Sequence, residues 1–127
     1  MISCVLDASA ILAYLEEESG SREVEKLLDE AAVSAVNIAE VASKLAERGA
    51  PADRIRQTIQ ALGVEVIPCD ETIAYRIGNL RSSTKALGLS LGDRACLATA
   101  LQQNVRAITA DRHWKTLKVG VRIQVIR

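Results

Sequence analysis

Four acidic side chains, spread along the whole chain, each lie close to a boundary between predicted elements. Asp7 follows the apolar run ISCVL and Asp111 follows the run AIT, whereas Glu40 and Asp93 fall one turn into predicted helices. Positions of both kinds meet at one edge of a parallel α/β sheet, where such sheets bind ligands. Two carboxylates about 5 Å apart repel by roughly 3 kcal/mol at an effective dielectric near 20. The four therefore lie apart, or several carry protons, or a divalent metal ion sits among them.

Each acid taken alone also has an ordinary structural explanation. Aspartate is among the best residues for capping a helix N-terminus, which would suit Asp7, and Asp111 could be a turn residue or a cap. The spacing from Asn37 to Glu40 is that of a capping box, and Asp93 would stabilise the dipole of its helix. The case for chemistry therefore depends on the joint placement of the four acids.

The composition is that of one domain with an aliphatic core. The chain has 127 residues, of which 49% are hydrophobic and 2% aromatic, and it contains no Phe. This is enough apolar material for a core without disulfide bonds, so we expect residues 1–127 to form a single domain. Cys4, Cys69 and Cys96 form no CxxC pair, and we expect buried, reduced thiols. Zinc spacing is absent, because His113 is the only histidine.

Charge is balanced over the whole chain but not over its halves. Residues 1–63 hold six Lys/Arg and eleven Asp/Glu, and residues 64–127 hold ten and five. This argues against a uniformly basic nucleic-acid binder, although one face could be acidic and another basic. The basic residues that could contact phosphates, or simply be solvated, are Arg76, Arg81, Lys85, Arg94, Arg112, Lys115 and Lys118. With no signal-like start and no apolar run of about 18 residues, we expect a cytoplasmic, soluble protein.

Hydrophobic spacing predicts strands that alternate with helices. The predicted strands are residues 2–6, 33–36, 64–67, 106–109 and 121–126. The predicted helices are residues 8–18, one from Ser21, 37–49, 51–63, 70–87 and 91–103, with a short turn or helix at 112–117. The strands are short and apolar enough for burial on both faces, which predicts an α/β fold with helices on both sides of a parallel sheet.

Four segments, taken in order, resemble PIN-domain ribonucleases, in particular the VapC-type toxins of toxin–antitoxin pairs. The segments are VLDASAIL, SAVNIAEV, LSLGDRACLATA and ITADRHW. Any one of them is weak evidence, but all four occur in the family's order and the resemblance covers essentially the whole chain. It implies a three-layer α/β/α sandwich with about five strands in the order 3-2-1-4-5. Asp7 and Asp111 would then be neighbours at the topological switch point.

The resemblance also implies which residues act. The implied metal-binding and catalytic acids are Asp7, Glu40, Asp93 and Asp111, with Ser9, Asn37 and Thr109 in supporting roles. Carboxylate oxygens suit Mg²⁺ or Mn²⁺, and such an ion can activate water for attack on a phosphodiester. We expect the three aspartates to be the main ligands, while Glu40 completes the shell or orients the attacking water. The sequence leaves one metal ion or two as alternatives.

Several other residues near the acids have two interpretations. Arg94 could contact phosphate or pair with a carboxylate, and Arg112 and Lys115 could guide RNA. We expect His113 to be a surface residue rather than a general acid. We expect Trp114 to be a core anchor rather than a platform for base stacking.

The expected activity is that of a Mg²⁺- or Mn²⁺-dependent endoribonuclease acting on RNA. The resemblance further implies a homodimer and a separately encoded antitoxin that covers an apolar groove and the acidic site. A catalytically silent PIN-like binding module is the alternative. A haloacid-dehalogenase-type phosphatase fits less well, because that class has a second aspartate two residues after the first, where this chain has Ser9.

Overall fold

A five-stranded parallel sheet forms the centre of the protein, whose computed structural model describes all residues 1–127. The strands are β1 (Cys4–Leu6), β2 (Ala31–Ser34), β3 (Glu65–Ile67), β4 (Arg106–Thr109) and β5 (Ile123–Val125). Their order is β3-β2-β1-β4-β5, and every neighbouring pair is parallel. The predicted fold class and strand order are confirmed. The topological switch point, where the strand order changes direction across the sheet, lies between β1 and β4.

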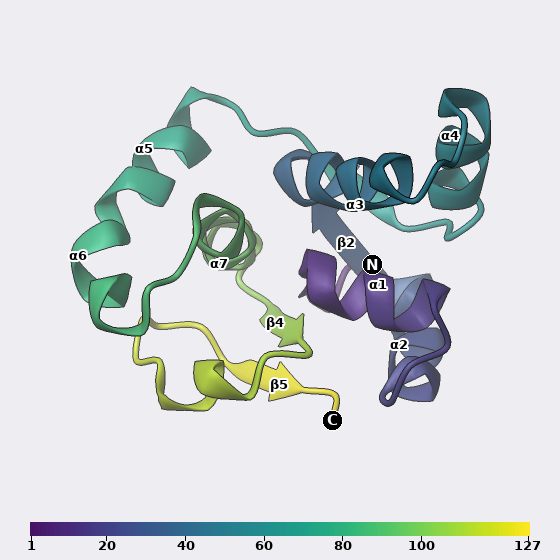
Figure 1. Cartoon of the computed structure of the whole chain (residues 1–127). Coiled ribbons are helices and arrows are strands. Elements are labelled where there is room, and N and C mark those ends of the chain that lie inside the picture. The colour runs from purple at the N-terminus through teal and green to yellow at the C-terminus, as the bar shows by residue number, and fades with distance from the viewer.

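Helices cover both faces of the sheet. They are α1 (Ala8–Leu15), α2 (Ser21–Leu27), α3 (Ala35–Glu47), α4 (Ala52–Gln60), α5 (Glu71–Asn79), α6 (Arg81–Thr84) and α7 (Leu91–Gln103), with the 3₁₀ turns η1 (Leu28–Glu30), η2 (Lys85–Leu87) and η3 (Arg112–Thr116). Figure 1 shows α5 and α6 beyond α7 on one side, and α4 beyond α3 on the other. None of these helices combines the length and apolar character needed to cross a membrane.

Side-chain alternation along the strands divides the core into two halves. Leu6, Val33 and Ile108 pack with α1, α2, α3 and α4, whereas the neighbouring residues Val5 and Ala107 face α5 and α7. Because both faces are covered, β1 and β2 are buried throughout, as is typical of a parallel sheet. The core is aliphatic as expected.

Trp114 is the aromatic anchor of the half of the core that contains α5 and α7. Its side chain is fully buried there, which confirms the interpretation as a core residue. Of the three thiols, Cys4 and Cys96 are buried and free. The expectation was wrong for Cys69, which is exposed because it follows the edge strand β3.

Several element boundaries differ from the sequence predictions. The second strand and third helix begin two residues earlier than predicted, because the Ser34 hydroxyl accepts a hydrogen bond from Val36 N at 3.1 Å and caps α3. Asn37, the predicted cap, therefore lies inside the helix. Asp70 caps α5 as predicted, but the predicted helix 70–87 is divided at Leu80 into α5 and α6 and ends in the 3₁₀ turn η2. The Leu80 carbonyl accepts from both Thr84 N at 3.2 Å and the Thr84 hydroxyl at 2.8 Å, and a hydroxyl that bonds back in this way bends a helix.

Candidate active site

Asp7 is a buried carboxylate held between β1 and α1. It follows β1, caps α1, and its side chain is hydrogen-bonded on both oxygens. Oδ1 accepts from Ala10 N at 2.8 Å and from the Ser9 hydroxyl at 2.7 Å, and Oδ2 accepts from the Thr109 hydroxyl at 2.5 Å. The parallel register that pairs Leu6 with Ile108 brings Asp7 and Thr109 together.

Burial raises the pKa of Asp7 from its ordinary 3.8 to about 6. The hydrogen bonds from Thr109, Ala10 and Ser9 act in the opposite direction, and the negative charge of Asp93 adds to the increase. Asp7 is thus a carboxyl group whose charged form is disfavoured by desolvation and only partly restored by its three donors. A cation beside it would remove that penalty.

Two hydroxyl groups connect Asp7 to the turn that carries Asp111. Ser9 Oγ lies 3.3 Å from Thr109 Oγ1 and accepts from Ala110 N at 2.9 Å. Thr109 Oγ1 accepts from Asp111 N at 3.0 Å. Ser9 and Thr109 therefore fix the orientation of Asp7 and the path of the chain after β4, which is the geometry expected of supporting residues.

Glu40 is positioned by the buried Asn37 and by the space that Gly92 leaves open. Asn37 is 1% exposed, and its Nδ2 donates to Glu40 Oε1 at 2.7 Å and to the Gly92 carbonyl at 3.0 Å. A Cβ atom on Gly92 would overlap the Glu40 carboxylate. The Glu40 carboxylate can therefore take this position against the first turn of α7 because residue 92 is glycine. Gly92 is not among the residues predicted from the sequence, although glycine in a helical segment is a signal of close approach.

Asp93 and Asp111 both cap the elements that carry them. Asp93 forms a reciprocal capping box with Ser90, with bonds of 3.1 and 3.0 Å. Asp111 Oδ1 accepts from His113 N and contacts the His113 ring, both at 2.9 Å. The His113 side chain is 84% exposed, as expected of a surface residue. The ordinary explanation of these acids is thus correct locally, and it leaves Asp93 Oδ1 and Asp111 Oδ2 without protein partners.

All four predicted acids line one cavity of about 220 Å³. Its lining consists of Asp7, Ala8, Ser9, Leu12, Glu40, Lys44, Asp93 and Asp111. Figure 1 places the elements that contribute them, α1, α3, α7 and the end of β4, around a common centre. Burial and then the charges of Asp7, Asp93 and Glu40 raise the pKa of the Cys96 thiol on α7.

The four acids are not arranged as a set of direct metal ligands. No group of three His, Cys, Asp or Glu side chains is arranged to hold an ion directly, since each carboxylate is hydrogen-bonded to its own neighbours. The donor set nevertheless fits a hard cation, because Glu40, Asp93 and Asp111 each keep one oxygen without a protein partner. Mg²⁺ keeps several waters and is commonly held through few direct carboxylate bonds. The residues therefore fit such an ion.

The predicted RNA-contacting residues lie outside this cavity. Arg94 Nη1 donates to the Ile77 carbonyl at 3.0 Å, which ties α7 to α5. Arg112 Nε donates to the Arg127 carbonyl at 2.9 Å, and Lys115 is exposed on η3. The basic residue in the cavity lining is instead Lys44, which is not among those predicted from the sequence.

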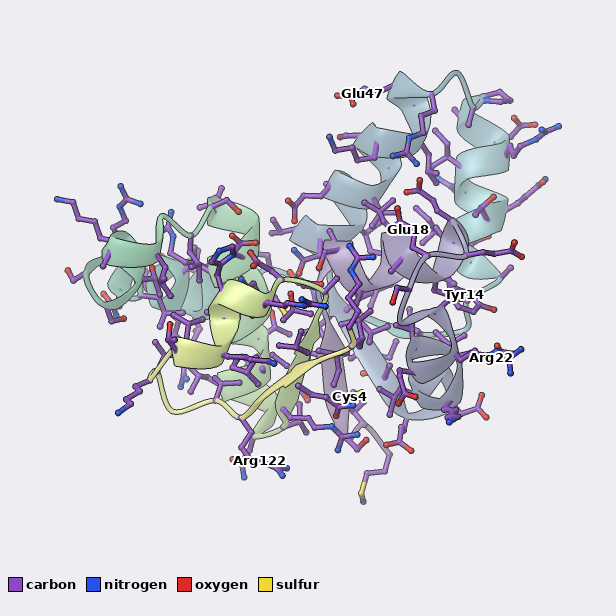
Figure 2. All side chains as sticks on the ribbon, turned by 60° about the horizontal axis from the view of Figure 1, so that its bottom comes forward. Cys4, Tyr14, Glu18, Arg22, Glu47 and Arg122 are labelled. Atoms are coloured by element: carbon purple, nitrogen blue, oxygen red, sulfur yellow. The ribbon has the colours of Figure 1, made fainter.

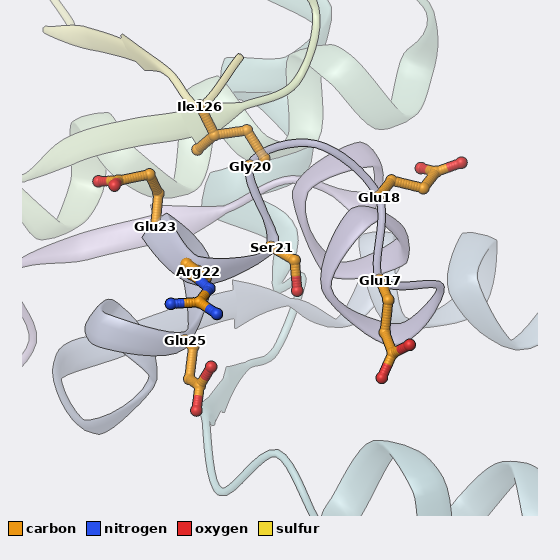
Figure 3. A pocket seen from close by; sticks show the side chains of 8 residues that line it. All are labelled: Glu17, Glu18, Gly20, Ser21, Arg22, Glu23, Glu25 and Ile126. Carbon is orange, nitrogen blue, oxygen red and sulfur yellow. The ribbon is translucent and has the colours of Figure 1, made fainter.

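A larger hollow of about 650 Å³ lies at the connection between α1 and α2. Its lining is Glu17, Glu18, Gly20, Ser21, Arg22, Glu23, Glu25 and Ile126. The carboxylates of Glu17, Glu18 and Glu23 point in different directions (Figure 3), so they do not form a site. This acidic connection and the basic Arg122, which precedes β5, lie well apart (Figure 2). Glu18 is instead close to Arg127, with Nη1 and Oε1 3.4 Å apart, so an acid from the first half of the sequence pairs with a base from the second.

Comparison with known proteins relates the chain to one family. The family model described as PIN domain matches residues 4–119. A DNA-bound VapBC structure from Salmonella typhimurium is 19% identical over 100% of both chains, with a TM-score of 0.77. FitAcB from Neisseria gonorrhoeae is 25% identical, over 94% of this chain and 95% of that chain, with a TM-score of 0.72. A toxin–antitoxin complex from Klebsiella pneumoniae is 22% identical over the same shares, with a TM-score of 0.73. No curated protein matches the sequence.

The raised pKa of Asp7 predicts how stability depends on pH. Between pH 3.8 and about 6 the folded chain binds more protons at Asp7 than the unfolded chain, so stability falls as pH rises through this window. Asp7→Asn removes this ionisation and should raise the free energy of unfolding near pH 8 by up to about 3 kcal/mol in EDTA. The gain should vanish near pH 4, which urea denaturation at both pH values would test. The exposed Asp53→Asn is the control, and an equal gain at both pH values would contradict the ionisation of Asp7 as the cause.

Gly92→Ala should act on the site through Glu40. The new methyl group would displace the flexible Glu40 carboxylate, while alanine itself is a better helix former than glycine. We expect stability within about 1 kcal/mol of the parent and a loss of Mn²⁺ affinity as large as that of Glu40→Ala, measured by calorimetry. In a double-mutant cycle, Gly92→Ala should have no further effect once Glu40 is alanine. Additive losses would show that Gly92 acts elsewhere.

Proposed function

Because this chain belongs to the PIN-domain family, we propose that it is a toxin-type nuclease, specifically a Mg²⁺- or Mn²⁺-dependent endoribonuclease. The observation that carries the proposal is the cavity in which Asp7, Glu40, Asp93 and Asp111 meet from four separate segments. Four acids around one cavity disfavour an anionic substrate unless a cation accompanies it. We further propose that residues 1–127 act as one cytoplasmic nuclease domain.

The three aspartates would hold the ion, directly or through water. When bound, a divalent cation lowers the pKa of a coordinated water and neutralises charge on the phosphate. Asp7 is the most rigid of the three, since its oxygens are oriented by Ser9, Ala10 and Thr109. Asp93 and Asp111 keep one oxygen each available while the other is used in a cap.

Glu40 suits the role of orienting the attacking water. Asn37 occupies Oε1 and thereby fixes the carboxylate plane, and Oε2 has no hydrogen bond from the protein. A water that hydrogen-bonds to Oε2 would lie beside the aspartates. No other side chain would then be required to act as a base toward that water. The exposed His113 contacts Asp111 and is not needed in this scheme. Sequence and fold give the rival phosphatase no support, because Ser9 stands where that class has its second aspartate.

An apolar groove between α3 and α4 is the surface we propose for the antitoxin. The groove has a volume of about 310 Å³ and is lined by Ile38, Ala42, Ala52, Ile55, Arg56, Ile59, Gln60 and Val66. Val66 is 48% exposed on the edge strand β3. Helix α3 contributes Ile38 and Ala42 to the groove and Glu40 to the acidic cavity. Because Glu40 is two residues from both Ile38 and Ala42, the groove and the acidic cavity lie on opposite faces of α3. A partner segment seated in the groove would reach the acids only by continuing around this helix. Solved VapBC and FitAcB structures share this fold.

The implied homodimer stays a prediction. Three large apolar side chains outside the groove, Tyr75, Leu87 and Leu91, are 67%, 40% and 59% exposed and offer contact area for a second copy.

RNA cleavage tests the proposed activity. The purified chain should cut an RNA pool in Mg²⁺ or Mn²⁺ but not in EDTA, and re-addition of the metal should restore cutting. Asp7→Asn should abolish cleavage because the most strongly oriented carboxylate is lost, whereas Asp53→Asn, in the first turn of α4, should cleave like the parent. Mapping RNA ends after brief induction would identify the cut sites.

Two outcomes would count against this proposal in different ways. Full cleavage by Asp7→Asn would show that Asp7 is not required for catalysis and would exclude it as a metal ligand. An absence of both cleavage and calorimetric heat with Mg²⁺ or Mn²⁺ would favour the silent binding module.

A charge placed in the groove tests the antitoxin surface. Val66→Glu should leave RNA cleavage unchanged but prevent inhibition by the small protein encoded beside this chain, because the carboxylate would be desolvated against apolar groove residues. Gln102→Glu places the same charge on an exposed position of α7 that lines neither the groove nor the acidic cavity, and it should leave inhibition intact. Cleavage assays with added partner would measure both. Equal inhibition of the parent and Val66→Glu would exclude this groove as the contact.

A further inference from the structure

Lys44 is the basic member of the cavity lining, which otherwise holds four acids and small or apolar residues. It lies four residues after Glu40 on α3, so both side chains lie on one face of the helix. The lining of the cavity therefore includes one lysine side chain together with four carboxylates, which come from the end of β1, from α3, from α7 and from the segment after β4. A lysine side chain is long and flexible, so its ammonium group can reach a ligand at this cavity.

The ammonium group of Lys44 is available for a ligand. Nζ lies 3.8 Å from Glu47 Oε2, and the Lys44 side chain is 56% exposed. An exposed pair at that distance contributes little to stability, so Lys44 can leave Glu47 at small cost. Arg94 and Arg112 are less available, since their guanidinium groups donate to the backbone carbonyls of Ile77 and Arg127.

We propose that Lys44 binds a phosphate of the RNA backbone beside the acidic cavity. The inference rests on the proposed nuclease function and adds a substrate contact to it. A polyanion that approaches four carboxylates is repelled even when one divalent ion is present, and a cation at the same cavity offsets part of that repulsion. Lysine suits this task, because its ammonium is a mobile point charge that can follow a phosphate.

The same charge has the opposite effect on metal binding. The Lys44 ammonium repels a divalent cation at the acids, so its removal should strengthen Mn²⁺ binding in the absence of RNA. Lys44→Ala should therefore weaken RNA binding and strengthen, or leave unchanged, Mn²⁺ binding. A variant that merely disturbed α3 would weaken both, because Glu40 lies on the same helix.

RNA affinity is measured by fluorescence anisotropy on the full chain carrying Asp7→Asn, which prevents cutting. The probe is a labelled single-stranded RNA of about 20 nucleotides and mixed sequence, titrated over a series of salt concentrations. Loss of one phosphate contact reduces the slope of log affinity against log salt by about 0.7, which corresponds to about fivefold in affinity at 0.1 M salt. We expect Lys44→Ala to show both the smaller slope and the weaker affinity, and Lys44→Arg to keep both at the values of the parent. Mn²⁺ affinity is measured by calorimetry on chains with Asp7 intact.

Lys26→Ala is the matched control. Lys26 is also an exposed lysine with a glutamate three residues away, at 3.7 Å, but it lies on α2 outside the acidic cavity. Its removal should leave the RNA affinity, the salt slope and the Mn²⁺ affinity at the parent values. An unchanged salt slope in Lys44→Ala, or a change no larger than that of Lys26→Ala, would overturn the assignment, as would weaker Mn²⁺ binding.

Failure of this inference differs from failure of the proposed function. If the parent cuts RNA and Lys44→Ala binds and cuts it equally well, only the phosphate contact falls. The Asp7→Asn chain could bind RNA too weakly to measure. In that case the rate of cleavage at low RNA concentration is measured against salt for the parent, Lys44→Ala and Lys26→Ala, each with Asp7 intact, and the slopes are compared in the same way. If the chain with Asp7 intact neither binds nor cuts RNA, both proposals fall together.

Discussion

The burial of Asp7 between two neighbouring strands is the constraint on which the site depends. A carboxyl group at the end of β1 is taken out of water, which raises its pKa to about 6, and its charge is tolerable only because three donors converge on it. One of these donors, Thr109, comes from β4 and arrives through the β1–β4 register. The cavity, the turn carrying Asp111 and the position of α1 are all arranged around that single group.

Capping and chemistry use different oxygens of the same side chains. Asp93 gives Oδ2 to the capping box of α7, and Asp111 gives Oδ1 to η3. Glu40 is held through Oε1 alone. Each of these groups is thereby oriented by one oxygen and presents the other to the cavity. The choice between a structural and a functional acid, which the sequence leaves open at each position, is therefore not a choice between exclusive roles.

Features that depend on residues close in the sequence could be predicted from it, whereas features that depend on distant contacts could not. Local patterns predicted α7 and β4 with the observed bounds, and the cap Asp70, because periodicity and capping depend on neighbouring residues. Ala31 and Ala32 carried too weak an apolar signal to mark the start of β2, although both are buried. The contact between Asn37 and Gly92 joins positions 55 residues apart, and the place of Lys44 at the cavity follows from tertiary packing. Neither can be read from local spacing, whereas the resemblance to PIN domains predicted four acids that the fold brings to one cavity.

Gly92 and Glu40 occupy what is in effect one shared volume. The space that a methyl group at position 92 would fill is taken by the end of the Glu40 side chain. An alanine at position 92 would push the Glu40 carboxylate out of this space, whereas a shorter acid such as aspartate at position 40 would leave room for it. The two residues are therefore sterically coupled, and the size of one decides which side chains are compatible with the other.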